Sequence, residues 1–148
     1  MKAVILGKAG STRVQHKNYR PFYGEMSLTD ILLEKLVRVM DRKDIYLSCE
    51  VPDFEYVAKK WGINYILRDE KYTQLATNTV DVVRNVCKDV PGDEDILYCS
   101  GMDPLFNDYK NMFDVWEEVR QEHDSLNVIY PIKNYFLDQN HNPVVFGF

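Results

Sequence analysis

A cluster of cations lies between the first apolar run of the sequence and its first amphipathic segment. The stretch Leu6–Phe22 contains no Asp or Glu, although the whole chain has a formal net charge of -5. Its cations are Lys8, Arg13, Lys17 and Arg20, and two glycines, Gly7 and Gly10, stand at its start. Glycines let a backbone come close to a ligand, and backbone N–H groups together with cations neutralise phosphate oxygens. The stretch therefore predicts a site for a small anionic ligand.

The polar side chains of this stretch suit a nucleotide. We expect its first three cations to reach phosphate oxygens, Ser11 and Thr12 to add hydroxyl donors, and Asn18 to hold a ribose or sugar hydroxyl. The spacing is neither that of a Walker A loop nor that of a Rossmann dinucleotide loop. Residue types alone therefore leave two readings open, a phosphate site and an ordinary solvated cationic loop.

Apolar periodicity predicts strands that alternate with helices along the chain. Unbroken apolar runs indicate buried strands, and apolar residues at near-helical spacing indicate helices. The expected strands are 2–7, 44–48, 63–67, 95–99 and 126–131; the expected helices are 27–41, 52–61, 80–90 and 109–123; a hairpin of 134–137 and 144–148 follows. Ser27 and Asp30 predict a capping box at the first helix, and Gly62 is placed to end the second. This order favours an α/β fold, a three-layer sandwich with a mostly parallel central sheet and a C-terminal hairpin.

Two more polar loops follow predicted strands. Arg68–Thr77 comes after the third strand, and Ser100–Phe106 comes after the fourth. Parallel strands carry their carboxyl ends at one edge of the sheet, where ligands of such folds bind, so we expect both loops to lie beside Leu6–Phe22. In the second of these loops Asp103 directly precedes Pro104, an arrangement typical of a simple turn.

Composition and charge exclude several classes of function. The 148 residues, 45% of them hydrophobic and 28% charged, fit one globular domain covering 1–148. A pI near 5.2 argues against nucleic acids and anionic membranes as partners, and no apolar run approaches the length of a membrane span. The cysteines, Cys49, Cys87 and Cys99, are odd in number and lack CxxC spacing, which is typical of a reducing cytoplasm. We therefore expect a cytoplasmic protein.

The cationic stretch resembles the N-terminal signature of the acylneuraminate cytidylyltransferase family, which makes CMP-activated sugars. That signature is close to A-R-x-x-S-K-x-x-x-x-K-N after the first strand, and this sequence keeps the type and spacing of four of its positions, in Lys8, Ser11, Lys17 and Asn18. Lys8 stands where the family usually has Arg. Further segments are similar in the same order along the chain: Tyr46-Leu47-Ser48, Leu67-Arg68, Leu75–Thr79, Pro104-Leu105, Tyr130-Pro131 and Asn142-Pro143.

The resemblance implies a nucleotide-diphospho-sugar transferase-like fold, related to Rossmann folds, and transfer of CMP from CTP to a small sugar acid with release of pyrophosphate. Lys8 and Lys17 would then be catalytic, stabilising the triphosphate, with Mg²⁺ as the expected cofactor and Asp103 as its candidate ligand. The nucleotide-binding residues that the resemblance implies are Leu6, Gly7, Lys8, Gly10, Ser11, Arg13, Lys17, Asn18, Arg68, Thr79 and Ser100.

Two alternatives to this activity stay open. Members of the family continue beyond the region that this sequence matches, and their later segment carries metal-binding aspartates and much of a dimer interface. We therefore expect Phe148 to end either a fragment or a short form, and we leave a homodimer open. The first alternative is a non-catalytic relative that binds a nucleotide or a partner, and the second is a phosphosugar nucleotidyltransferase that uses another nucleoside triphosphate.

Overall fold

A computed structural model of the chain describes residues 1–10, 14–73, 77–99, 106–129, 139–140 and 142. The chain divides into two compact units, Met1–Lys110 and Asn111–Phe148. The first unit holds the sheet and the helices that pack on it. The predicted Ser11, Thr12, Arg13, Ser100 and Asp103 lie outside the described residues.

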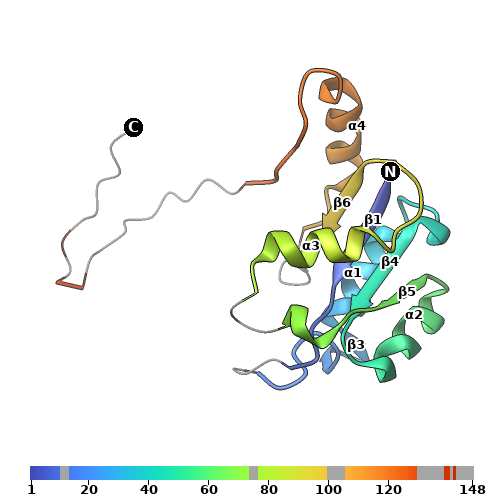
Figure 1. The fold of residues 1–148 in the computed structure, drawn as a ribbon, viewed down its shortest axis with the longest axis vertical. Coiled ribbons are helices and arrows are strands. Elements are labelled where there is room, and N and C mark those ends of the chain that lie inside the picture. Colours follow the sequence, from blue (N-terminus) through green and yellow to red (C-terminus); the bar gives the residue numbers. More distant parts are fainter. Residues whose placement is uncertain (11–13, 74–76, 100–105, 130–138, 141, 143–148) are drawn as a thin grey trace. The chain divides into compact units, whose positions relative to one another are not determined.

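Four parallel strands form the central sheet of the first unit, in the order β5-β4-β1-β6 (Figure 1). The strands are β1 (Lys2–Leu6), β4 (Ile45–Cys49), β5 (Asn64–Leu67) and β6 (Ile96–Cys99). Each lies within one residue of its predicted bounds at either end. The parallel registers, such as Val4 opposite both Tyr46 and Tyr98, place all four carboxyl ends at one edge of the sheet.

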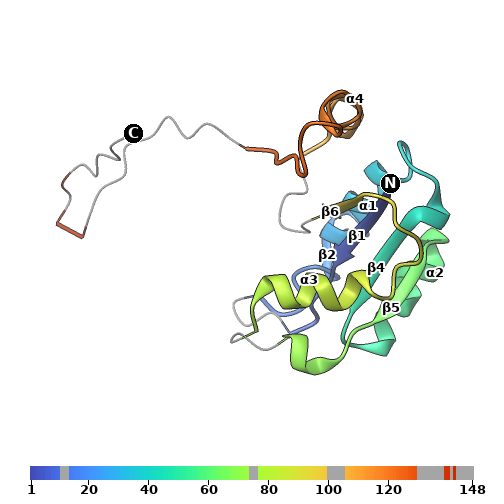
Figure 2. The ribbon, with the colours of Figure 1, turned by 45° about the horizontal axis from the view of Figure 1, so that its top comes forward.

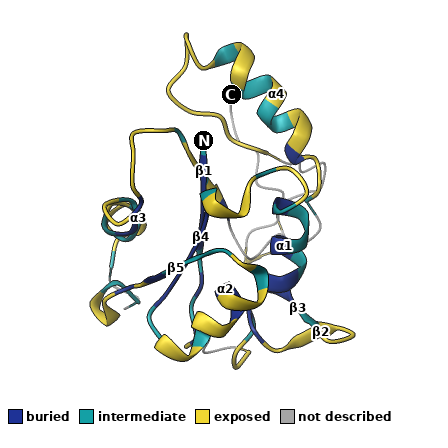
Figure 3. Cartoon of the chain, turned by 90° about the vertical axis from the view of Figure 1, so that its right-hand side faces the viewer, coloured by how far each residue is buried: buried dark blue, intermediate teal, exposed yellow. Residues whose placement is uncertain are grey.

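Helices cover both faces of this sheet. α3 (Thr79–Cys87) lies on one face, and α1 (Leu28–Leu36) and α2 (Glu55–Trp61) lie on the other (Figures 2 and 3). Successive strand residues point to opposite faces, which divides the core in two. Toward α3 the core cluster consists of Val4, Tyr46, Ile66, Val86 and Val90. The fully buried residues of the other face and of α1 include Ile5, Ile45, Leu47, Leu32, Leu33 and Leu36. The predicted α/β fold with a mostly parallel sheet is confirmed.

Local signals set the helix ends as predicted in two cases. The Ser27 hydroxyl accepts from the Asp30 backbone N–H, while the Asp30 carboxylate accepts from the Ser27 backbone N–H, so the capping box is present. Gly62 ends α2 in the left-handed conformation, with φ of 64°. The predicted extension of α1 to residue 41 is wrong. After Leu36 some backbone hydrogen bonds span three residues instead of four, such as Val39 N–H to Leu36 C=O at 3.0 Å. Bonds of this kind are typical of the last turn of a helix.

Several short elements were not predicted. β2 (Pro21–Tyr23) and β3 (Met26–Ser27) pair antiparallel around a turn at Gly24, whose φ of 55° suits glycine. The 3-10 turns η1 (Arg42–Asp44) and η3 (Glu70–Thr73) were not predicted either. The 3-10 turn η2 (Pro52–Phe54) forms the first turn of the predicted helix 52–61, which becomes α-helical at Glu55. The small antiparallel pair matters for the site because it closes the loop after β1 against the start of α1.

The predicted fifth strand is wrong over its described part. α4 (Tyr109–Val119) ends before the expected residue 123, and Leu126–Ile129 form no strand. Ile129 is 83% exposed. Apolar β-branched residues favour a strand only where a neighbouring strand and a packed face receive them. The rest of that segment and the predicted hairpin strands lie outside the described residues. Among the helices that the structure describes, none is long and apolar enough to span a membrane.

Candidate functional site

The loops that leave β1, β4 and β5 meet at the carboxyl edge of the sheet. Gly7 follows β1, Glu50 follows β4 and Arg68 follows β5. The backbone N–H of Gly7 donates to Ser48 C=O at 2.8 Å, and that of Arg68 donates to Cys49 C=O at 2.9 Å. These bonds continue the parallel ladders past the strand ends. The edge therefore brings together residues from three separate parts of the sequence.

Arg68 connects these three loops. Its guanidinium donates to Gly7 C=O at 2.6 Å and to Ser48 C=O at 3.3 Å, and it forms an ion pair with Glu50 at 3.1 Å. Its side chain is only 3% exposed. The resemblance implied that Arg68 binds the nucleotide; here its Nη1 and Nη2 donate to protein acceptors, and its Nε is buried without a partner. Arg68 thus joins the loops after β1, β4 and β5 and fixes how they lie relative to one another.

Glu50 was not singled out from the sequence. Its Oε1 accepts from the backbone N–H of Ala9 at 2.8 Å and lies 3.5 Å from that of Gly10, while its Oε2 pairs with Arg68. A cue was available: an acidic residue directly follows an apolar strand whose end shares the edge with the cationic stretch. The partners of that residue could not be read from the sequence, because they depend on the order of the strands.

Lys8 and Asn18, two of the predicted site residues, lie together. The Asn18 side-chain amide is placed to donate to Lys8 C=O at 3.4 Å, and the Lys8 ammonium donates to Thr73 C=O at 2.7 Å. Asn18 is itself fixed by the start of α1, since its C=O accepts from the backbone N–H of Thr29 at 3.1 Å and from the Thr29 hydroxyl at 2.8 Å. The capped helix therefore positions a predicted ligand contact.

Unpartnered polar atoms gather at this edge. In the described part of the chain, the buried side-chain atoms without a hydrogen bond are Asn18 Oδ1, Tyr19 OH and Arg68 Nε. Tyr19 and Arg68 lie against Gly7, and Asn18 lies against Lys8. The Tyr19 hydroxyl lies beside the Cys49 thiol, which is a weak partner, and burial raises the Tyr19 pKa far above its usual value. Buried polar atoms left unsatisfied are uncommon in folded proteins and often mark a functional site.

The two glycines of the loop have different roles. A Cβ on Gly7 would overlap the Tyr19 hydroxyl and approach Ser48 C=O, so Gly7 is required by packing inside the protein. A Cβ on Gly10 would meet nothing within 4 Å. Of the two glycines, therefore, only Gly10 presents backbone to open space, where a ligand could approach it.

The remaining predicted residues are spread around the edge. Lys17 is half-buried in the turn before Asn18, and His16 in that turn has a φ of 52°, which is uncommon outside glycine. Leu6 packs against the core cluster under α3. Thr79 is exposed as the first residue of α3, directly after Asn78, whose side chain caps that helix by accepting from Val80 N–H at 2.9 Å. Among the described residues, no hydrogen bond joins Thr79 to the cationic loop.

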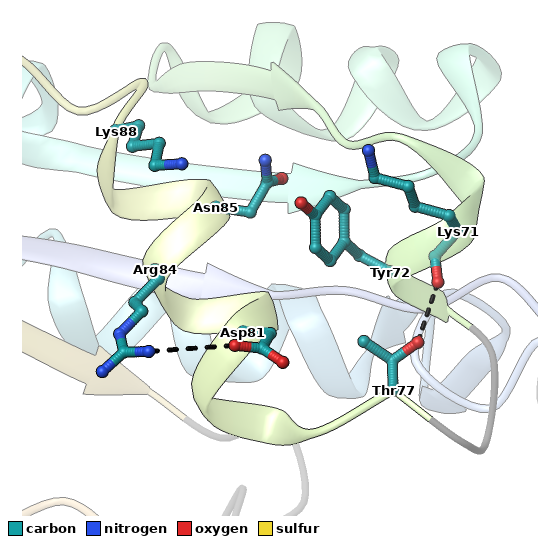
Figure 4. Close-up of a pocket in the computed structure, with 7 residues that line it drawn as sticks. All are labelled: Lys71, Tyr72, Thr77, Asp81, Arg84, Asn85 and Lys88. Carbon is teal, nitrogen blue, oxygen red and sulfur yellow. Dashed lines mark hydrogen bonds and ion pairs between the residues drawn. The ribbon is translucent and has the colours of Figure 1, made fainter.

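A separate hollow of about 370 Å³ lies between η3 and α3 (Figure 4). Its cations are largely exposed, and Arg84 pairs with Asp81 at 3.9 Å, with Arg84 75% exposed. None of the described residues predicted individually to bind the nucleotide lines it, although three lining residues belong to the predicted polar loop Arg68–Thr77. The lining residues are Lys71, Tyr72, Thr77, Asp81, Arg84, Asn85 and Lys88. The hollow thus adjoins the loop that Lys8 contacts through Thr73 but uses none of the residues assigned to nucleotide binding.

The described residues supply no evident metal centre. Among them, no group of three His, Cys, Asp or Glu side chains could hold a metal ion. The cysteines are free, and burial raises the pKa of the Cys99 thiol to about 12, so this thiol stays protonated at neutral pH. Asp103, the residue predicted to bind Mg²⁺, is outside the described part.

Comparisons with known proteins agree on one family. A family model described as cytidylyltransferase matches residues 3–144. The structure is similar to a CMP:2-keto-3-deoxy-manno-octonic acid synthetase complexed with CTP, with a TM-score of 0.65, 16% identity and 82% of this chain covered. It is also similar to a cytidylyltransferase from Leptospira borgpetersenii serovar Hardjo-bovis (strain JB197), with a TM-score of 0.59, 22% identity and 80% coverage. No curated protein sequence matches the chain significantly.

The two solved structures are longer than this chain, which spans 47% of each. At such low identity they show the fold, and the family model carries the assignment. These matches support the cytidylyltransferase part of the resemblance and do not single out its acylneuraminate branch. Because the family model extends over nearly all of the sequence, the chain belongs to the cytidylyltransferase family.

Proposed function

We propose that the chain binds CTP at the carboxyl edge of its sheet and transfers CMP to a sugar acid, with release of pyrophosphate. Family membership supports the use of CTP, and one structural neighbour is by its name a synthetase of a CMP-linked sugar acid. The observation that carries the proposal is the cluster of unpartnered buried polar atoms around Gly7 and Lys8, at the edge where α/β folds bind ligands.

The reaction would be a substitution at the α-phosphorus of CTP. A hydroxyl oxygen of the sugar acid forms a new bond to that phosphorus, the bond to the bridging oxygen of the β-phosphate breaks, and pyrophosphate leaves with that oxygen. The hydroxyl proton passes to solvent or to a base. Chemistry of this kind depends mainly on positioning and on stabilising negative charge.

Lys8 and Lys17 are the described cations proposed to supply that stabilisation. The Lys8 ammonium holds only a backbone carbonyl, Thr73 C=O, so a phosphate oxygen could replace this neutral acceptor with a charged one. Lys17 is half-buried in the adjoining turn. Ser11, Arg13 and Ser100 stay in the proposal on the resemblance alone.

Asn18 is proposed to recognise the nucleoside. Its Oδ1 is buried and unpartnered while its amide nitrogen is directed to Lys8 C=O, so the free atom is an acceptor. An amino group or a hydroxyl of the nucleotide would satisfy it, and satisfying a buried acceptor is worth more than adding a bond at the surface. The site would therefore favour a ligand with a donor at that position.

Mg²⁺ remains part of the proposal as an expected cofactor. When bound with the triphosphate it would add positive charge. The described residues offer no three-ligand set for it, so we assign none of them to the metal and route no step through it.

The test is pyrophosphate release from CTP in the presence of a panel of sugar acids that includes 2-keto-3-deoxy acids and acylneuraminates. We expect release with at least one acceptor. Lys17→Ala should lower it strongly, whereas Lys59→Ala, which removes a 71% exposed lysine on α2, should not. No release with any acceptor, together with intact CTP binding, would contradict the transfer reaction.

Nucleotide binding without turnover is the second candidate. It is favoured by one observation: the backbone N–H of Ala9 is already bonded to Glu50, so the loop offers one donor fewer to stabilise the charge that develops during transfer. Thermal shifts with CTP, UTP, ATP and GTP would show which nucleotide binds, if any. A larger shift with UTP or GTP than with CTP would instead favour the phosphosugar nucleotidyltransferases.

A further inference from the structure

Glu50 is an acidic residue that accepts a hydrogen bond from the backbone of Gly7–Gly10, the loop proposed to bind the phosphates. Its side chain is 9% exposed, and its two oxygens have separate partners. Oε1 accepts from Ala9 N–H at 2.8 Å, and Oε2 pairs with Arg68 at 3.1 Å. We propose that Glu50 is a positioning residue, which holds the backbone of Gly7–Gly10 in the conformation that binds the triphosphate; this inference rests on the proposed function.

Glu50 and Arg68 together hold the loop at two points. Arg68 donates to Gly7 C=O at 2.6 Å, and Glu50 accepts from Ala9 N–H two residues later. The guanidinium and the carboxylate are joined to one another, so a single buried ion pair sets the path of the chain as it leaves β1. Lys8 lies between the two points, and its backbone and the start of its side chain follow that path.

The effect of the pair extends to Asn18. The carbonyl of Lys8 is directed at the Asn18 side-chain amide, which determines how the unpartnered Oδ1 is aimed. A change in the backbone at Ala9 therefore alters two proposed ligand contacts, the Lys8 ammonium and the Asn18 acceptor. Glu50 touches neither phosphate nor nucleoside in this arrangement and acts through other residues.

A competing idea is that the Glu50 carboxylate occupies the phosphate position until CTP displaces it. Burial argues against this. Displacement would leave Arg68, 3% exposed, without its anionic partner, and an unpaired buried charge is strongly unfavourable. Arg68 Nη1 is already directed at the Ser48 carbonyl and hydroxyl, so these groups give the guanidinium no replacement for the lost anion. Glu50 is therefore a permanent part of the loop.

The two ideas predict opposite results for one substitution. Glu50→Gln keeps the size and an acceptor but removes the charge. If Glu50 positions the loop, CTP should bind about tenfold more weakly, which corresponds to losing one charge-assisted hydrogen bond. CMP, with one phosphate, should lose less affinity than CTP. If Glu50 competes with phosphate, CTP should bind more tightly than it does to the wild type.

The experiment measures CTP and CMP affinities by calorimetry for the wild type, Glu50→Gln, Glu50→Asp and Glu55→Gln. Glu55→Gln is the matched control, because it removes the same charge from an exposed pair with Lys59. Glu50→Asp keeps the charge for Arg68 but shortens the reach to Ala9, so it should stay folded and still bind CTP more weakly. The ¹⁵N-resolved amide protons of Ala9 and Gly10, recorded without nucleotide, should move upfield in Glu50→Gln.

The outcomes separate this inference from the proposed function. A wild type that binds neither CTP nor CMP contradicts the proposed function. The amide shifts of Ala9 and Gly10 then still test whether Glu50 holds the backbone of Gly7–Gly10. A wild type that binds CTP, beside Glu50 variants with an unchanged ratio of CTP to CMP affinity, overturns the inference alone. Tighter CTP binding in Glu50→Gln overturns it as well, and failure of both Glu50 variants to fold would assign the residue a purely structural role.

Discussion

Two buried carboxylates of this protein lie in very different surroundings. Asp30, at the start of α1, accepts from Ser27, from Lys60 at 2.8 Å and from Trp61 at 2.7 Å. Every polar atom of that group is matched. Glu50 and Arg68 also pair, yet Arg68 Nε is buried without a partner, as are Asn18 Oδ1 and the Tyr19 hydroxyl in the neighbouring loop. The difference separates a network built for stability from one that leaves capacity for a ligand.

The pKa of Asp30 reflects this matching. Burial alone would raise the pKa, but the hydrogen bonds from Lys60, Trp61 and Ser27 outweigh it and lower the pKa from 3.8 to about 2. The ionised form is thus the stable one in the folded protein. Substitutions at Asp30 should therefore change mainly the free energy of unfolding. Substitutions at the carboxyl edge of the sheet should change mainly the affinity for CTP.

The largest effect is expected from Asp30→Ala. The change removes the capping box and leaves the Lys60 and Trp61 donors without their acceptor, so the free energy of unfolding should fall by about 3 kcal/mol. Urea denaturation measures it, with Glu55→Ala as the exposed control. At temperatures where the variant is folded, its affinity for CTP should fall by less than the loss expected for Lys8→Ala, because Asp30 acts on the site only through Thr29 and Asn18. A larger loss of affinity would contradict this division between stability and binding.

A smaller stability effect is expected from Gly7→Ala. The new methyl group would overlap the Tyr19 hydroxyl, and overpacking of this kind costs about 2 kcal/mol. The double variant with Tyr19→Phe should recover part of the loss, because the hydroxyl is gone. Gly10→Ala, where the methyl meets open space, is the control. Thermal unfolding of the wild type, Gly7→Ala, Tyr19→Phe and the double variant measures the coupling, with Gly10→Ala measured beside them. Equal losses for both glycines would contradict the assigned contact.

Acid should weaken the Asp30 network selectively. Because its folded pKa lies below the unfolded value of 3.8, Asp30 contributes stability above about pH 4, and this contribution is lost as the pH falls toward 2. The full contribution is about 2 kcal/mol. The stability difference between the wild type and Asp30→Asn, measured by denaturation at pH 6 and pH 3, should narrow at the lower pH. A difference that is independent of pH would contradict the assignment.

The smallest effect in free energy is expected from Lys8→Ala, and it should appear in binding. Losing one charged contact to phosphate should weaken CTP binding about tenfold, without a comparable change in unfolding. Calorimetric titration measures the affinity. Lys59→Ala provides the comparison, since that lysine is exposed on α2. Equal affinities of the two variants would remove Lys8 from the site.

Sequence reasoning succeeded where the determinants are local. The capping box of Ser27 and Asp30 needs only two residues three positions apart, and the strands need only short apolar runs. Their shared edge follows from parallel pairing. The carboxylate that binds the loop was missed because Glu50 and Arg68 meet only through the order of strands β4 and β5.

The wrong predictions have a common physical cause. Leu126–Ile129 have strand-forming residues but no described strand beside them, and α1 stops after Leu36 where its buried face ends. Local preference is overridden by what the rest of the chain packs against a segment. The unpartnered acceptor on Asn18 was likewise beyond sequence reasoning, since it depends on Thr29 and Lys8 both contacting the same residue.

Amide chemical shifts during titration with CTP test the central claim most directly, because they locate the nucleotide on the chain. We predict that the resonances of Ala9, Gly10 and Asn18 move as CTP is added, while those of Arg84, Asn85 and Lys88 around the separate hollow stay in place. Shifts confined to the hollow, or no shifts at saturating CTP, would contradict a nucleotide site at the carboxyl edge of the sheet.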